Sequence, residues 1–276
     1  MIRTIEKKVW YGWTFLVLLF FALLACGVSK QNLIKAKTQM DIGTAYIEAG
    51  KYSMAIGELV KSAELNPDDP RVHYFLALAY HSINLEDKAS KEIEKAIKLR
   101  KDYAEAYNLQ GTILLGQKKN DQAISAFEKA LSNVTYDTPA VSLYNMGMAY
   151  YQKGEYKTAV SKFQEAEIRE PNSIIMPAIQ INMAWTYFAI GEMGHAIERF
   201  KKALSITPDI AEPYYGLGKC YYEKKDKTQA ASAFRSVIRL LPNSEMAEKS
   251  KENLKNMGMT VEESVSVPVI IEKKTR

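Results

Sequence analysis

Few side chains in this sequence are of the types that carry out acid–base catalysis, nucleophilic attack or metal binding. The 276 residues include three histidines, His73, His81 and His195, and two cysteines, Cys26 and Cys220. They form no H-E-x-x-H pair and no cysteine cluster, and the sequence has no phosphate-binding loop and no G-x-S-x-G turn. One of the three falls at a core-type position and the others near helix ends, so each is predicted to be packed or solvated. We therefore expect no enzyme, no catalytic residue, no metal site and no cofactor.

The two cysteines have different sequence surroundings. Cys220 follows Gly218 by two residues within an apolar helical pattern, where a small apolar residue is usual, so we expect a buried structural thiol. Pairing with a cysteine of another chain is the alternative. Cys26 ends the apolar run Trp13 to Ala25, which follows a short basic segment, and these are the parts of a secretory signal.

The sequence Leu-Leu-Ala-Cys, ending at Cys26, resembles the bacterial lipobox, in which the cysteine is acylated and becomes the first mature residue. The resemblance implies a lipoprotein signal peptide over residues 1–25, lipidation at Cys26 and a linker over residues 26–35. Gly27 replaces the Asp that would signal retention at the inner membrane, which favours the periplasmic face of the outer membrane. The alternative is an uncleaved span from Val9 to Val28, since about 20 apolar residues cross a bilayer, with the repeats held in the periplasm by the inner membrane.

The overall charge does not indicate a nucleic-acid partner. The formal net charge is +5, and three basic residues against one acidic residue in the first eight positions contribute 3 − 1 = +2 of it. The remaining +3 is spread over mixed charges, which is too weak for an electrostatic footprint on nucleic acid. A composition of 47% hydrophobic and 25% charged residues, with few Gly and Pro, is typical of a helical solenoid.

A helical hairpin pattern is clearest between Ala140 and Ser173. Its marker residues are Leu143, Met146, Gly147, Tyr150, Ala159, Phe163, Ala166 and Pro171. Their spacing resembles the tetratricopeptide repeat (TPR) pattern W-x2-L-G-x2-Y, A-x3-F, P, which recurs about every 34 residues. Gly147 is expected to be small because a neighbouring helix crosses there, Gly154 to mark the turn, and Pro171 to end the second helix.

Five further copies of the pattern occupy most of the remaining chain. The sequence therefore predicts an all-α fold: a right-handed TPR superhelix of six helix-turn-helix repeats over residues 36–243. Because each repeat buries its faces only against its neighbours, an end cap is needed, and Ser244 is predicted to start a capping helix over residues 244–258, with Gly258 as its stop. Residues 259–276 are predicted to be a disordered tail.

In such an array the first helices of the repeats line a concave groove. The family resemblance places the second, fifth, ninth and twelfth positions of each repeat toward that groove. Repeats usually carry a polar Asn at the ninth position, but Leu78, Met148 and Trp185 stand there. The resulting apolar stripe favours binding of a protein segment, unless another part of the solenoid or the tail covers it. The predicted partner-binding residues are Tyr74, Leu78, Leu115, Tyr144, Met148, Tyr151, Ile181, Trp185, Phe188, Tyr215 and Tyr222.

The combination of lipobox, six repeats and capping helix resembles the TPR lipoproteins of type IV pilus biogenesis, of the PilF/PilW type, which act as pilotins. The resemblance implies a lipid-anchored scaffold whose groove helps a secretin subunit to assemble in the outer membrane. It implies a protein partner and a membrane contact through the lipid, and neither nucleic acid nor a small-molecule substrate. The alternative is a periplasmic TPR adaptor for cell-wall enzymes or for outer-membrane protein assembly.

Overall fold

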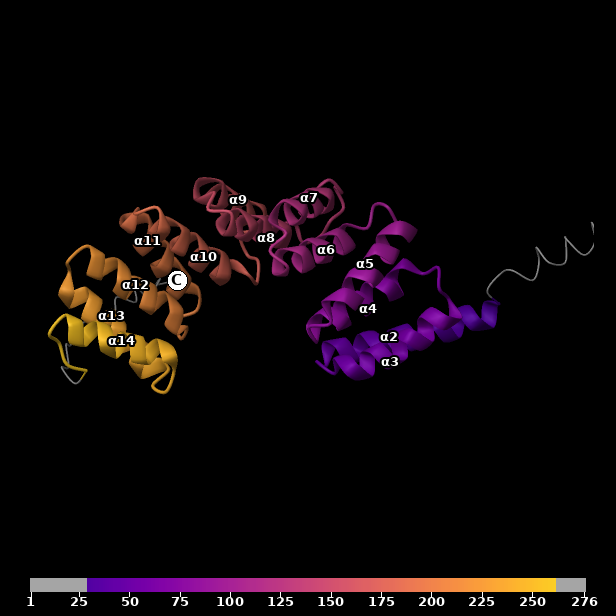
Figure 1. The fold of residues 1–276 in the computed structure, drawn as a ribbon, viewed down its shortest axis with the longest axis horizontal. Coiled ribbons are helices and arrows are strands. Elements are labelled where there is room, and N and C mark those ends of the chain that lie inside the picture. Colours follow the sequence, from indigo (N-terminus) through magenta and orange to yellow (C-terminus); the bar gives the residue numbers. More distant parts are fainter. Residues whose placement is uncertain (1–28, 262–276) are drawn as a thin grey trace, which may run out of the picture. The chain divides into compact units, whose positions relative to one another are not determined.

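The computed structural model describes residues 29–261, which contain 13 helices and no strand (Figure 1). The predicted signal segment, Cys26 and nearly all of the predicted tail lie outside the described residues. The helices are α2 (Lys30–Glu48), α3 (Tyr52–Leu65), α4 (Pro70–Ser82), α5 (Glu86–Leu99), α6 (Ala104–Gly116), α7 (Asn120–Leu131), α8 (Pro139–Gln152), α9 (Tyr156–Arg169), α10 (Met176–Ala189), α11 (Met193–Ile206), α12 (Ala211–Glu223), α13 (Lys227–Leu240) and α14 (Glu245–Asn256). The all-α fold class is confirmed.

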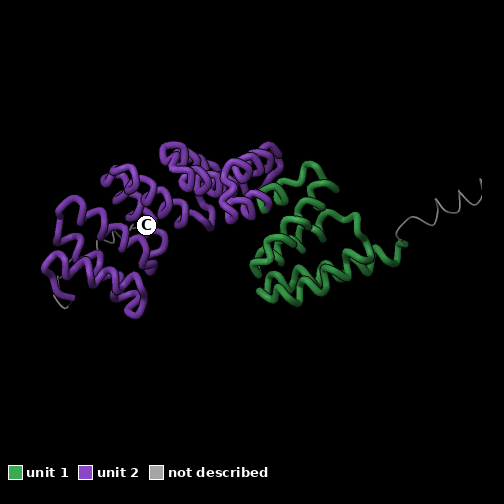
Figure 2. Tube along the Cα trace, viewed as in Figure 1, with its two compact units in different colours: residues 1–109 green, residues 110–276 purple. Residues whose placement is uncertain are grey.

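The chain forms two compact units, residues 1–109 and residues 110–276 (Figure 2). In unit 1, α2 packs against α3 and α4 against α5. In unit 2, α8 packs against α9, α10 against α11, and α12 against α13, and α14 covers α13. Consecutive helix pairs of this kind are the packing that the repeat pattern predicts. Among the described helices, none has the length and hydropathy needed to cross a bilayer.

The small residue of each repeat pattern marks a close approach between the two helices of a hairpin. A Cβ atom on Gly147 of α8 would lie 2.5 Å from Cε1 of Phe163 on α9, and one on Gly218 would lie equally close to Phe234. Since real Cβ atoms do not approach other atoms so closely, these positions accept only glycine unless the ring moves. The predicted crossing at Gly147 is confirmed, and the crossing element is the second helix of the same hairpin.

The turn inside each hairpin requires a left-handed backbone conformation. Gly154 has φ +77° and Gly191 has φ +83°, as a turn glycine does at low steric cost. The corresponding positions in three other hairpins carry Asn84, Lys118 and Lys225, with φ between 59° and 62°. The two lysines adopt a conformation that is unusual for their type, so the hairpin geometry overrides their local preference.

The two ends of the helical array differ in how well they could be predicted. Ser244 caps α14 by accepting a hydrogen bond from the backbone N–H of Ala247, and Gly258 follows the helix with φ +74°. At the other end, residues 30–35 were expected to belong to a linker, but the structure places them in α2. The reason is that the Ser29 hydroxyl accepts a hydrogen bond from the N–H of Asn32 at 3.1 Å and starts the helix there.

Candidate partner-binding surface

Three first helices of unit 2 carry a group of aromatic and apolar side chains, which we call the inner surface. Helix α10 contacts both α8 and α12, so their side chains can form one surface. The side chains of the inner surface are partly exposed. All of them have intermediate exposure except Tyr222, which is 39% exposed. The inner surface consists of Tyr144, Met148 and Tyr151 on α8, Trp185 and Phe188 on α10, and Glu212, Tyr215 and Tyr222 on α12.

Trp185 occupies the centre of the inner surface and is held from several sides. Its indole Nε1–H donates a hydrogen bond to Oε1 of Glu212 at 2.9 Å. Its ring meets Phe200 and Phe188 edge-on, at centroid distances of 5.0 and 5.7 Å, and lies 6.4 Å from Tyr215. Such edge-on pairs stabilise a fixed ring orientation. Trp185 is therefore a rigid, half-buried side chain, suited to act as a binding anchor.

Tyr144 lies on the neighbouring helix and has a similarly defined position. Its hydroxyl oxygen accepts a hydrogen bond from Nδ2 of Asn182 at 3.0 Å. Burial raises the pKa of Tyr144, and the negative charge of Glu212 raises it further. The phenol therefore keeps its proton at neutral pH, and the inner surface has Glu212 as a carboxylate among aromatic rings.

This arrangement suits a particular kind of ligand group. Glu212 stands in the first turn of α12, where the helix dipole favours a negative charge. Aromatic faces attract cations, and a nearby carboxylate adds to that attraction. The inner surface can thus bind an apolar segment that also carries a lysine or arginine, whereas an acidic segment would be repelled by Glu212.

The predicted groove residues do not all behave alike. Ile181 is only 6% exposed and joins the core of unit 2, so its assignment to an exposed groove is corrected. Tyr144 at the same repeat position stays partly exposed and has a hydroxyl that accepts a hydrogen bond, whereas an aliphatic side chain has no polar end. Leu115 is half-buried and packs against the core cluster that includes Phe127. Tyr74 and Leu78 belong to unit 1 and are not part of the inner surface of unit 2. Their role in partner binding stays a prediction.

Two polar residues of the inner surface were not found by sequence reasoning. Glu212 stands at the second position of its repeat, which the repeat register already places toward the groove, so reading out that position would have found it. Asn182 stands at the sixth position, outside the register used, and only the structure shows that its amide reaches Tyr144.

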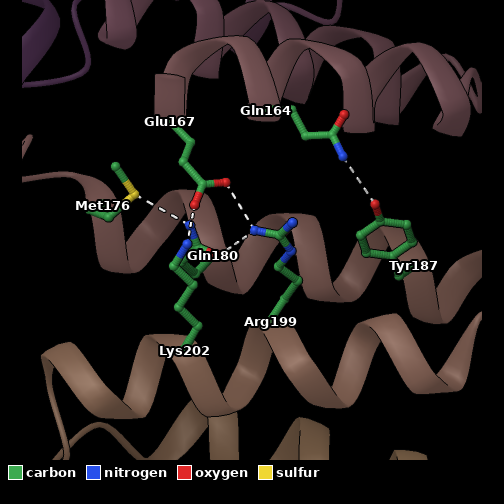
Figure 3. Close-up of polar contacts among 7 residues, drawn as sticks. All are labelled: Gln164, Glu167, Met176, Gln180, Tyr187, Arg199 and Lys202. Atoms are coloured by element: carbon green, nitrogen blue, oxygen red, sulfur yellow. Dashed lines mark hydrogen bonds and ion pairs between the residues drawn. The ribbon is translucent and has the colours of Figure 1, made fainter. Parts of the chain in front are cut away.

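A second cluster lies at the packing interface of α9, α10 and α11 (Figure 3). Arg199 donates to Oε2 of Glu167 at 2.9 Å and to Oε1 of the fully buried Gln180 at 3.3 Å. Lys202 also pairs with Glu167, and the Gln180 amide donates to the sulfur of Met176. Burial alone would raise the pKa of Glu167, but the hydrogen bond from Lys202 and the charge of Arg199 outweigh it and lower the pKa. The polar groups of this cluster form hydrogen bonds and ion pairs with one another, which indicates a structural role.

His73 and Cys220 are both buried in the helical array. His73 is buried, and its ring nitrogens lie 2.6 Å from Oε2 of Glu92 and 2.8 Å from the carbonyl oxygen of Pro67. Both partners are acceptors, so the ring is best satisfied as the imidazolium. Cys220 is fully buried, and burial raises its pKa to about 12, which keeps the thiol unreactive. In residues 29–261, no group of three His, Cys, Asp or Glu side chains could hold a metal ion.

Family models for tetratricopeptide repeats match most of the helical part of the chain, at residues 43–84, 70–103, 102–170, 186–225 and 214–244. Among curated proteins, DnaJ homolog subfamily C member 3 of Gallus gallus is 21% identical over 86% of this chain and 48% of its own length. Tetratricopeptide repeat protein 13 of Homo sapiens is 28% identical over 67% of this chain and 22% of its own length. The chain therefore spans less than half of either relative.

Solved structures show the same fold at low sequence identity. PilW, described as a widely conserved type IV pilus biogenesis factor, superposes with a TM-score of 0.73 at 21% identity, covering 78% of this chain and 97% of PilW. PilF of Pseudomonas aeruginosa has a TM-score of 0.69 at 20% identity, covering 80% of this chain and 98% of PilF. YrrB, a TPR protein with an unusual peptide-binding site, has a TM-score of 0.55 at 22% identity over 70% of this chain and 97% of YrrB. At these identities the likeness shows the fold alone.

Proposed function

Because the chain belongs to the tetratricopeptide repeat family, we propose that it is a non-enzymatic scaffold that binds a segment of a partner protein on the inner surface of unit 2. TPR scaffolds recognise extended or helical peptides in the groove lined by their first helices. One observation carries the proposal: Trp185 is held rigidly beside Glu212 and Tyr215 yet stays partly exposed. A side chain with only a core role would be buried, as Phe200 is.

The chemistry of the inner surface narrows the partner. The bound segment presents an apolar side chain to Trp185 and a basic group to the Glu212 carboxylate and the rings around it. Anchors of this kind typically contribute on the order of 2 kcal/mol or more each. Both α8 and α12 flank Trp185 on α10, so a segment that crosses the three helices can use all of these contacts at once.

The particular scaffold that we propose is a pilotin-type lipoprotein of type IV pilus biogenesis. The supporting observations are the lipobox-like sequence ending at Cys26 and the shared fold with PilW and PilF. Acylation of Cys26 would attach the protein to the periplasmic face of the outer membrane, with an inner-membrane span as the alternative anchor. The partner would then be a secretin subunit, whose assembly the inner surface assists.

The second candidate is a periplasmic TPR adaptor for cell-wall enzymes or outer-membrane protein assembly. It would use the same inner surface and the same anchor, so the identity of the captured partner separates it from the first. The peptide-binding site reported for YrrB shows that the fold is used for peptides, which suits either candidate.

The test is photocrosslinking from the inner surface in cells that produce the full chain. A photoreactive residue replaces Met148, which packs against the same core cluster as Trp185, and a matched control replaces Ile168 on α9, which is 78% exposed. We expect an adduct with a secretin subunit from position 148 but not from position 168. The adduct should be lost with Trp185→Ala and mislocalised with Cys26→Ala. Capture of wall enzymes would favour the second candidate, and equal adducts from both positions would contradict binding on the inner surface.

A further inference from the structure

Helix α2 is longer than the other first helices of the repeats. It has 19 residues, whereas α4, α8, α10 and α12 have 13 or 14, and its hairpin partner α3 has 14. The excess of 19 − 14 = 5 residues lies at the start of α2 and carries it about 7 Å beyond the hairpin, at 1.5 Å per residue (Figure 1). This projecting start of α2 packs little against the repeats. The residue types found there are therefore not required for packing between α2 and α3.

The projecting start has an apolar and basic exposed face. Lys30 stands three and four residues before Leu33 and Ile34, and Lys37 stands four and three residues after them, so these four side chains lie on adjoining parts of the helix surface. The buried residues of α2 are Ala36, Met40 and Gly43, and Leu33, three residues before Ala36, lies at the exposed end of their side. Leu33 is 43% exposed and Ile34 is 61% exposed, the highest value for a large apolar side chain in α2.

The charge of this segment is of one sign. Lys30, Lys35 and Lys37 are all exposed, and the first acidic residue of α2 is Asp41. In the described residues none of the three lysines forms an ion pair with a carboxylate. Lys30 also stands in the first helical turn, where the helix dipole disfavours a positive charge. These exposed lysines are therefore available to an anionic partner outside the chain.

The short stretch of chain between Cys26 and α2 indicates that the anionic partner is a membrane surface. Cys26 and Lys30 are four positions apart, so a fully extended chain spans about 14 Å at most between them. With either anchor of the proposed function, acylated Cys26 or a span ending at Val28, the start of α2 lies within that distance of the bilayer surface. A basic helix face with exposed aliphatic side chains is suited to the interface of an anionic bilayer.

We propose that the projecting start of α2, together with Lys35 and Lys37 just after it, binds the surface of the anchoring membrane, with Leu33 and Ile34 in the interface and the three lysines on anionic phospholipid headgroups. The proposal rests on the membrane anchoring in the proposed function and not on the inner surface. It makes α2 a rigid continuation of the anchor, because the helix begins directly at the capped Ser29. Unit 1 is then held at the bilayer in one orientation instead of hanging from a loose linker.

The test uses the full chain in vesicles of phosphatidylethanolamine and phosphatidylglycerol. A photoreactive diazirine residue replaces Ile34, and a matched control replaces Met54, which is 51% exposed on α3. Met54 lies near the far end of α2, about 28 Å from its start for 19 residues. We expect phospholipid adducts, identified by mass, from position 34 and not from position 54.

A charge variant separates headgroup binding from mere proximity. Each lysine close to an anionic surface is worth on the order of fivefold in affinity, so Lys30→Gln, Lys35→Gln and Lys37→Gln together should reduce the adducts from position 34 at least fivefold. The matched control changes Lys91, Lys98 and Lys101, three exposed lysines of unit 1, to Gln and should leave the adducts unchanged. Replacing phosphatidylglycerol by phosphatidylcholine should act like the first variant.

The outcomes distinguish failure of this inference from failure of the anchoring. Membrane-bound protein without lipid adducts at position 34 overturns the inference and leaves the anchor intact. Adducts with a second copy or with another protein at that position also overturn it. Protein absent from the vesicle fraction overturns both.

Discussion

Two surfaces of the same helix, α10, use polar groups in opposite ways. Toward α9 and α11, Gln180 is fully buried, and its amide joins Glu167, Arg199 and Lys202 in a cluster whose members satisfy one another. Toward α8 and α12, Trp185 stays half-exposed beside one carboxylate. A polar cluster closed on itself stabilises the packing of repeats, whereas aromatic rings left partly exposed around a single charge offer contacts to a partner. We therefore assign stability to the first surface and binding to the second.

Glu167→Ala should have the largest effect on the stability of the protein. Removing the carboxylate leaves the Arg199 guanidinium, whose side chain is 18% exposed, without its anionic partner. We expect the free energy of unfolding to fall by about 2 to 3 kcal/mol, because hydrogen bonds between charged, partly buried groups are lost, with partner affinity unchanged for the folded protein. Urea denaturation followed by circular dichroism measures the first quantity. Glu165→Ala is the matched control, because Glu165 pairs with Lys162 on the surface of the same helix and should cost less than about 0.5 kcal/mol.

The second prediction concerns Trp185→Ala on the opposite surface. Loss of the ring should weaken partner binding by about 2 kcal/mol, or roughly 30-fold, because a central aromatic anchor is removed. Trp185→Phe keeps a ring and loses the hydrogen bond to Glu212, so it should cost about 1 kcal/mol. Calorimetric titration with the crosslinked partner segment gives these values, at a temperature where unfolding curves show each variant to be folded. An affinity equal to that of the unchanged protein would remove Trp185 from the binding site.

The third prediction is that acidic pH removes the stabilisation that Glu167 provides. Glu167 has a lowered pKa in the folded protein, so its stabilisation is fully present above the ordinary glutamate value of 4.5 and is lost as the pH falls through the folded value. Against Glu167→Gln, the unchanged protein should be more stable by about 1.5 kcal/mol at pH 7, and the difference should shrink below pH 4.5. Unfolding curves of both proteins along a pH series measure this difference. A difference that stays constant into acid would show that the carboxylate charge contributes nothing.

The smallest expected effect belongs to Tyr144→Phe. The change removes the hydroxyl that accepts a hydrogen bond from Asn182 and keeps the ring. Since Asn182 also donates to the carbonyl oxygen of Ala178, we expect a loss of about 0.5 to 1 kcal/mol in unfolding free energy. The binding partner should still be captured. A loss as large as that of Glu167→Ala would mean that the two surfaces of α10 do not differ in their use of polar groups.

The hairpins follow from local patterns of residue types along the chain. The spacing of a small residue on one helix and a ring on the next, as in Gly147 and Phe163, is set by one local crossing, and the turn glycine and the proline after the second helix are local signals too. The cap of α14 at Ser244 was predictable for the same reason. The cap at Ser29 has the same local form, but it was not predicted from the sequence. The repeat pattern begins at residue 36, so the residues before it were assigned to a linker.

The contacts between polar and apolar groups of different repeats depend instead on how the helices pack. The contact of Trp185 with Glu212 joins side chains 27 positions apart, and that of Arg199 with Glu167 joins side chains 32 positions apart. Ile181 is buried although its repeat position points toward the groove in the family pattern. A periodic pattern fixes the face of a helix on which a residue lies, but side-chain length and the packing angle between neighbouring helices decide what it touches. The fold therefore follows from local spacing, and the binding surface from packing between helices that the spacing does not encode.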